Sequence, residues 1–173
     1  MTDPSAVTPY WALTLAYWFH MLATVIWIGG LSLLVLFILP AAQINLKSRE
    51  FAEFIGKIQT RLDSVGWLSL VMLGGTGLIQ MSSNPNYQGF LTISNRWSTV
   101  ILIKHLVFLG MIIVSAYLTW GIIPAQRRAA LLEATGQVSP QAGRLRRRAM
   151  WLLRLNLLFG LLVLGLTAMA RAS

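Results

Sequence analysis

The chain contains no cysteine and only two histidines and five acidic residues. Without cysteine there can be no disulfide, no thiolate metal site, no iron–sulfur cluster of the usual kind and no catalytic thiol. We expect the acidic residues at the surface or at helix ends: Asp3, Glu50, Glu53, Asp63 and Glu133. No triad, carboxylate pair or phosphate-binding loop is recognisable, so conventional acid–base hydrolysis is not expected.

Apolar residues dominate what remains. The sequence is 56% hydrophobic and 11% charged, with a mean hydropathy of +0.67. Four apolar stretches, at about residues 11–40, 64–81, 97–123 and 149–170, are each long enough to cross a hydrocarbon core of ~30 Å as a helix. Helices satisfy their own backbone hydrogen bonds, which lipid cannot do. The sequence therefore predicts an all-α, single-domain protein over residues 1–173, a four-transmembrane-helix bundle running up-down-up-down.

The basic residues are distributed unevenly, within a net charge of +9. Of the 14 basic residues, 11 flank the connections between spans 1 and 2 and between spans 3 and 4: Lys47, Arg49, Lys57, Arg61, Arg127, Arg128, Arg144, Arg146, Arg147, Arg148 and Arg154. The positive-inside rule then puts both termini outside and these connections in the cytoplasm, in a plasma membrane such as the bacterial inner membrane. Anionic lipid headgroups are the expected partner of these arginines, and nucleic acid is not an expected partner.

The first cytoplasmic connection has an amphipathic pattern. Its apolar residues fall on one helical face, at Phe51, Phe54, Ile55, Ile58 and Leu62. The pattern predicts a short cytoplasmic amphipathic helix between spans 1 and 2, or a continuation of span 1 past the membrane. Ser139-Pro140 predicts a turn or flexible link before span 4.

Both histidines lie inside predicted spans, His20 in the first and His105 in the third. An ionisable residue within a span indicates a functional site by default. Counted from the start of each span, both lie about 12–13 Å below the same rim. Equal depth on two parallel helices is what a shared ligand would need, although it can also arise by chance.

Other polar and soft side chains accompany them. Lys104, His105, Ser115 and Thr119 fall within one sector of the third span, and Lys104 is either part of a site or a snorkelling side chain. Met21 and Met81 belong to the same half of the membrane as the histidines. Thioether and imidazole together suit Cu(I), although methionine is also ordinary core filler. In the second span, Gly66, Gly74 and Gly77 either allow close packing or leave room for a flat ligand, and in the fourth Asn156 predicts an interhelical hydrogen bond.

Several short motifs resemble the copper-resistance D (CopD) family. Trp18-Phe19-His20-Met21-Leu22-Ala23, followed by Trp27-Ile28-Gly29-Gly30, is similar to that family's opening helix. Ile103-Lys104-His105-Leu106 with Ser115-Ala116-Tyr117 resembles its lysine-bearing later helix, and Gly75-Thr76-Gly77 the helix between. The resemblance implies a copper-handling membrane protein in which His20 is the best-matched site residue.

A weaker resemblance is to the HemJ-type protoporphyrinogen oxidases, which are associated with haem b. His20 and Lys104 match that family's histidine and lysine, whereas Leu39-Pro40-Ala41-Ala42 lacks the arginine that follows its Leu-Pro pair.

Three hypotheses follow. The first is copper binding or transport, with His20 and His105 as ligands and Met21 or Met81 assisting. The second is a haem b redox protein, for electron transfer or porphyrinogen oxidation, with His20, His105 and Lys104 at the cofactor. The third is an accessory subunit of a larger membrane-protein complex, without a ligand of its own.

Overall fold

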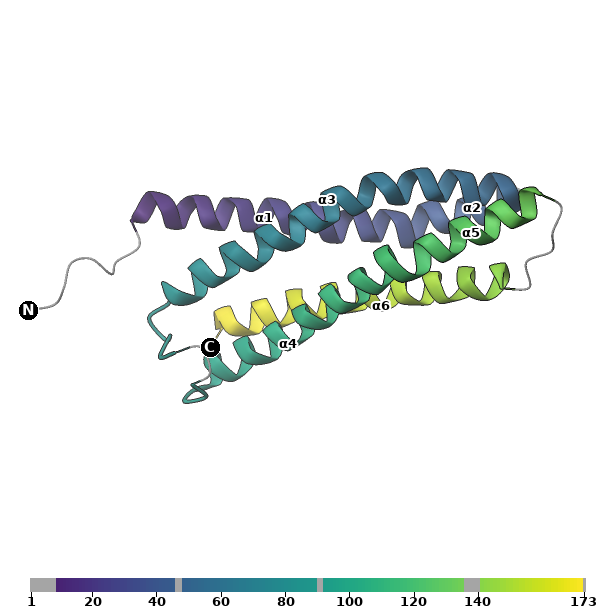
Figure 1. The fold of residues 1–173 in the computed structure, drawn as a ribbon. Helices are drawn as coiled ribbons and strands as arrows, with labels where there is room; N and C mark the ends of the chain where they lie inside the picture. Colours follow the sequence, from purple (N-terminus) through teal and green to yellow (C-terminus); the bar gives the residue numbers. More distant parts are fainter. Residues whose placement is uncertain (1–8, 46–47, 90–91, 136–140, 173) are drawn as a thin grey trace, which may run out of the picture.

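The computed structural model describes residues 9–45, 48–89, 92–135 and 141–172, and within these ranges the only regular elements are helices (Figure 1). They form four long helical segments, Tyr10–Asn45, Ser48–Ser82, Arg96–Ala134 and Ala142–Ala172. Each contains a stretch long and apolar enough to cross a membrane. The all-α class and four helices able to cross a membrane are therefore confirmed, and the chain is a multi-pass membrane protein.

The first and third segments are each built from three pieces. The first consists of α1 (Tyr10–Ser32), a π-helical piece (Leu33–Ile38) and α2 (Leu39–Asn45). The third consists of α4 (Arg96–Ala116), a second π-helical piece (Tyr117–Ile122) and α5 (Ile123–Ala134). The second and fourth segments are the uninterrupted helices α3 (Ser48–Ser82) and α6 (Ala142–Ala172).

Proline explains the two π-helical pieces. Pro40 and Pro124 each follow such a piece by two residues. A proline inside a helix has no N–H and its ring clashes with the carbonyl four residues earlier. The wider turn relieves this clash, and the N–H just before each proline bonds five residues back, from Leu39 to Leu34 and from Ile123 to Leu118. Both helices thereby continue past their prolines.

The helices pack as two pairs, α1 with α3 and α4 with α6, and the pairs meet through contacts of α6 with α1 and of α3 with α5. The start of α1, the end of α3, the start of α4 and the end of α6 lie at one end of the bundle, and α2 and α5 at the other (Figure 1). Much of the buried apolar core lies towards the α2–α5 end, including Leu34, Leu39, Ile55, Leu118, Ile122 and Leu153.

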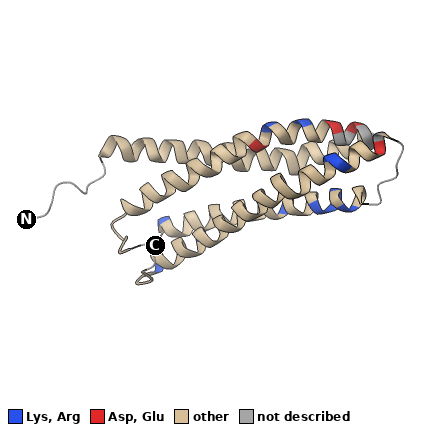
Figure 2. Cartoon of the chain, viewed as in Figure 1, with Lys and Arg blue, Asp and Glu red and all other residues tan. Residues whose placement is uncertain are grey.

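Figure 2 shows most of the lysines and arginines at this same α2–α5 end. The segment predicted as a separate amphipathic helix is instead the first part of α3, which runs without a break into the second span. On its apolar face, Ile55 joins the buried core, and Ile58 and Leu62 pack against this core. Ser139-Pro140, Asp3 and Lys47 lie outside the described residues, and the side of the membrane that each end faces stays a prediction.

Candidate functional site

A large cavity of about 670 Å³ lies between α1, α3, α4 and α6. We call it the histidine cavity, because both histidines line it. All five residues that the sequence singled out as ligands lie on its wall: His20, Met21, Met81, Lys104 and His105. The cavity extends to Asn84 and Asn86, which follow α3, and therefore lies in the half of the bundle opposite the arginine-rich end. Side chains from three helices are thus brought to one space.

The partner of His20 determines which ring nitrogen carries its proton. Nδ1 of His20 lies 2.9 Å from Oγ1 of Thr76 on α3. The Thr76 hydroxyl donates its single hydrogen to the carbonyl of Met72, so towards the histidine it can only accept. Nδ1 of His20 is therefore the donor, and in the neutral ring Nε2 carries the lone pair. Metal-binding histidines commonly have such an outer partner, which fixes the ring and its tautomer.

His105 is oriented in a similar way from its own helix. Its Nδ1 lies 2.7 Å from the backbone carbonyl of Ile101, one turn earlier in α4. A carbonyl can only accept, so Nδ1 carries the hydrogen and Nε2 of the neutral ring carries the lone pair. Both histidines that line the cavity therefore have the lone pair on the same ring nitrogen, the one that most often binds a metal or haem iron when Nδ1 donates.

Soft sulfur ligands and positive charges complete the wall. Met81 is buried, whereas Met21 is 64% exposed. Met111, which the sequence did not single out, also lines the cavity and is fully buried. Lys104 and Arg171 add two basic side chains. Among the described residues no three histidine, aspartate or glutamate side chains converge, so a metal ion here would need methionine or another neutral ligand besides the two imidazoles.

The glycines of α3 fit around aromatic rings. A Cβ on Gly77 would lie 3.5 Å from Cε1 of His20, and one on Gly74 would lie 3.8 Å from the ring of Phe108. Gly66 is tighter, because a Cβ there would lie 2.5 Å from Cζ3 of Trp27. Close packing is therefore what Gly66 provides, and Gly77 lets α3 lie against the His20 ring.

One expectation about the acidic residues is wrong. Asp63 lies neither at the surface nor at a helix end: it is in the middle of α3, half-buried, and it lines a second cavity. Asp63 is not at a helix end because α3 also includes the segment before it, which the sequence predicted as a separate amphipathic helix. A signal was present in the sequence, since Gln59, Asp63 and Gly66 share one helical face at spacings of four and three.

The predicted interhelical role of Asn156 is confirmed. Its Nδ2 donates to Oγ of Ser115, 2.8 Å away, which joins α6 to α4. Ser115 is buried, so this bond is made away from solvent.

Comparison with known proteins identifies a family. The family model described as copper resistance protein D (CopD) matches residues 56–170, which is more than half of the chain. No curated protein and no solved structure shows significant similarity to the chain. The matched range includes α4, most of α3 and nearly all of α6, and three of the five predicted ligands, Met81, Lys104 and His105. His20 and Met21 precede it.

Proposed function

The chain belongs to the copper resistance protein D family, and on this premise we propose that it binds copper in the histidine cavity and moves it through the membrane. Copper is the cargo here. His20 and His105 are the proposed ligands, assisted by a methionine. The observation that carries the proposal is that two membrane-embedded histidines line one cavity and each uses Nδ1 as a hydrogen-bond donor.

The donor set suits the reduced ion. Imidazole and thioether select Cu(I) over hard cations, and among the described residues no carboxylate lines the histidine cavity. Met81 and Met111 are the better candidates for the sulfur ligand, because they are buried while Met21 is mostly exposed. The partner of His20 at Thr76 supports this role by holding the ring in one orientation.

The charge distribution supports an orientation. With the arginine-rich end in the cytoplasm, both termini and the histidine cavity lie in the outer half of a plasma membrane. Copper would then enter the site from outside, and anionic lipid headgroups would bind the cytoplasmic arginines.

Anaerobic titration of the purified protein with Cu(I), in competition with a chromophoric chelator, tests the proposal. His20→Ala and His105→Ala should each weaken binding by more than about ten-fold, since even outer partners of a ligand are worth 10–100-fold. Met81→Leu and Met111→Leu probe the sulfur ligand. Met169→Leu is the matched control, because Met169 is exposed and does not line the cavity. Unchanged binding in both histidine variants would refute the copper site.

A second candidate, a haem b redox protein, is favoured by the volume and charge of the cavity. Cofactor sites measure roughly 300–1,000 Å³, and 670 Å³ is far more than one metal ion needs. Lys104 and Arg171 would suit the two carboxylates of a haem, and His20 and His105 would hold its iron. Haem would supply one-electron chemistry.

An oxidised and a dithionite-reduced absorption spectrum separates these candidates. A Soret band with sharp reduced α and β bands, lost in His20→Ala, would favour haem over copper. A protein with neither copper nor haem, recovered only with larger partners, would favour the accessory-subunit hypothesis.

A further inference from the structure

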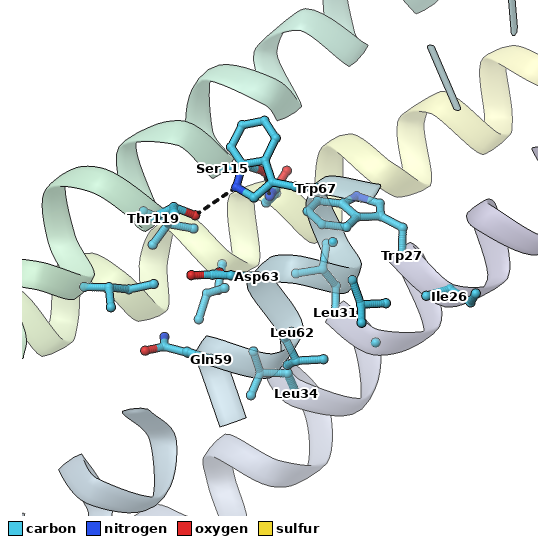
Figure 3. Close-up of a pocket in the computed structure, with 17 residues that line it drawn as sticks. Ile26, Trp27, Leu31, Leu34, Gln59, Leu62, Asp63, Trp67, Ser115 and Thr119 are labelled. Atoms are coloured by element: carbon cyan, nitrogen blue, oxygen red, sulfur yellow. Dashed lines mark hydrogen bonds between the residues drawn. The ribbon is translucent and has the colours of Figure 1, made fainter. Parts of the chain in front are cut away.

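A second, smaller cavity of about 80 Å³ lies nearer the arginine-rich end, and we call it the aspartate cavity (Figure 3). Its wall is mixed. Apolar side chains of α1, α3 and α6 form much of it, and five polar side chains face it: Gln59, Asp63, Ser115, Thr119 and Asn156. Asp63 is the only ionisable side chain on this wall among the residues that the structure describes.

Trp27 separates the two cavities, since its side chain lines both. Its six-membered ring lies against the backbone of Gly66, where even a methyl group would come within 2.5 Å. The indole is therefore held between α1 and α3 as a partition, with the histidine cavity on one side and the aspartate cavity on the other.

Two buried polar atoms on this wall have no hydrogen-bond partner in the structure, Nε1 of Trp27 and Oδ1 of Asn156. Asn156 is 1% exposed, and its Nδ2 is already bonded to Ser115. The Ser115 hydroxyl in turn donates to the carbonyl of Met111, so it has no hydrogen left for Oδ1. A buried donor or acceptor without a partner is costly, which indicates that something else occupies the cavity.

Water suits both unpartnered atoms, because it can accept from the N–H of Trp27 and donate to Oδ1 of Asn156, whereas a cation would serve only Oδ1. A cavity needs about 10–15 Å³ and two to four polar partners to hold one water, and at about 80 Å³ this one has room for several.

Asp63 is oriented towards the same space. Thr119 lines the same cavity, and Nε1 of Trp67 donates to Oγ1 of Thr119 over 3.4 Å (Figure 3). Around Asp63, α1 contributes Trp27 and Leu31, α4 and the following π-helical piece contribute Ser115 and Thr119, and α6 contributes Asn156. None of these is charged. On α5, the guanidinium of Arg127 donates to Oγ1 of Thr60, which precedes Asp63 in α3.

We propose that the aspartate cavity is a hydrated proton-binding site, in which Asp63 exchanges a proton with waters held between Trp27 and Asn156. The step is balanced: hydronium gives one proton to the carboxylate and leaves as water, and the reverse step restores it. This site goes beyond copper binding, because it uses another cavity and another ligand, and it does not depend on the identity of the metal.

The chain contains only two aspartates, Asp3 and Asp63, which allows a clean test. Full-length Asp3→Asn protein in lipid nanodiscs, labelled with [4-¹³C]aspartate, carries one labelled carboxyl group. Its ¹³C resonance should move reversibly with pH while the protein stays folded. Asn156→Leu should change the proton affinity by about ten-fold, one pH unit. Asn45→Leu is the matched control, since Asn45 is exposed and bonds only within its own helix.

A second measurement needs no substitution among the residues that line the cavity. In the same labelled protein, the ¹³C-shifted infrared band of the protonated carboxyl group should move promptly on transfer to D₂O, because waters reach Asp63. A resonance that does not respond to pH, a band that does not exchange, or a saturable response to Na⁺, K⁺ or Cu⁺ at fixed pH would overturn the proposal. Copper binding measured on the same sample is a separate result, so failure here leaves the copper proposal standing.

Discussion

Replacing Gly66 with alanine tests whether the Trp27 partition is built as described. The new Cβ would lie 2.5 Å from Cζ3 of Trp27 and 3.2 Å from Cε3. Carbon atoms in ordinary contact are about 3.5–4.0 Å apart, so the indole has to move by roughly 1 Å. The atoms that must move belong to a rigid ring packed between two helices rather than to the end of a flexible chain.

The expected cost follows from overpacking. Forcing an extra methyl group into a packed site costs about 1–3 kcal/mol, while replacing glycine by alanine in a helix gains up to about 1 kcal/mol. Gly75→Ala separates the two effects. Gly75 is in the same helix, and a Cβ there meets nothing within 4 Å. The free energy of unfolding of Gly66→Ala should therefore be lower than that of Gly75→Ala by about 1–3 kcal/mol.

Reversible unfolding in mixed micelles, followed by circular dichroism, measures this difference. In a Trp27→Leu background the ring is gone, and Gly66→Ala should then resemble Gly75→Ala, as a coupling between contacting residues requires. If the two alanine variants are equally stable in the wild-type background, Trp27 does not pack on Gly66, and both the partition and the separation of the two cavities are wrong.

Three further predictions follow from single contacts. Thr76→Val removes the partner of His20 and should weaken Cu(I) binding by about 10–100-fold in the chelator assay, whereas the exposed Thr14→Val, which bonds only within its own helix, should not. Asn156→Ala should lower the free energy of unfolding by about 1 kcal/mol or more, through the lost bond to Ser115 and the space left behind, and equal stability in the micelle assay would contradict this. Asn95→Ala removes the reciprocal cap at the start of α4 and should cost about 0.5–2 kcal/mol in the same assay.

Much of the fold could be predicted from hydropathy alone, because membrane helices are set by local composition. The all-α class and the four apolar helices could be predicted without knowing which helices touch. The continuous course of α3 could not be predicted from hydropathy. A polar, amphipathic sequence at the interface is compatible either with a helix along the membrane surface or with one that leads into the membrane. The contacts of Ile55 with the core favour the second arrangement.

The histidines of the site could be found from the sequence because ionisable residues are rare in lipid. Met21, Met81 and Lys104 could be found because they lie at the same depth in the membrane as the histidines. Three features could not be found in this way. Thr76 is a common membrane-helix residue, and only the structure pairs it with His20. Met111 looks like any apolar residue until its place on the cavity wall is known. The half-buried position of Asp63 could not be found because the cavity that it lines is formed with residues of α1, α4 and α6, which are distant in the sequence.

The two π-helical pieces stand at matching places in the two helix pairs. They begin at Leu33 and Tyr117 and are followed by Pro40 and Pro124, so both features recur after 84 residues (117 − 33 and 124 − 40). The helix pairs α1–α3 and α4–α6 divide the chain between α3 and α4, so each pair contains one π-helical piece and one of these prolines. Each pair thus begins with a helix that has a π-helical piece before a proline and ends with an uninterrupted helix. The same offset relates His20 to Lys104, so corresponding positions in the two interrupted helices give the cavity an imidazole from α1 and an amine from α4.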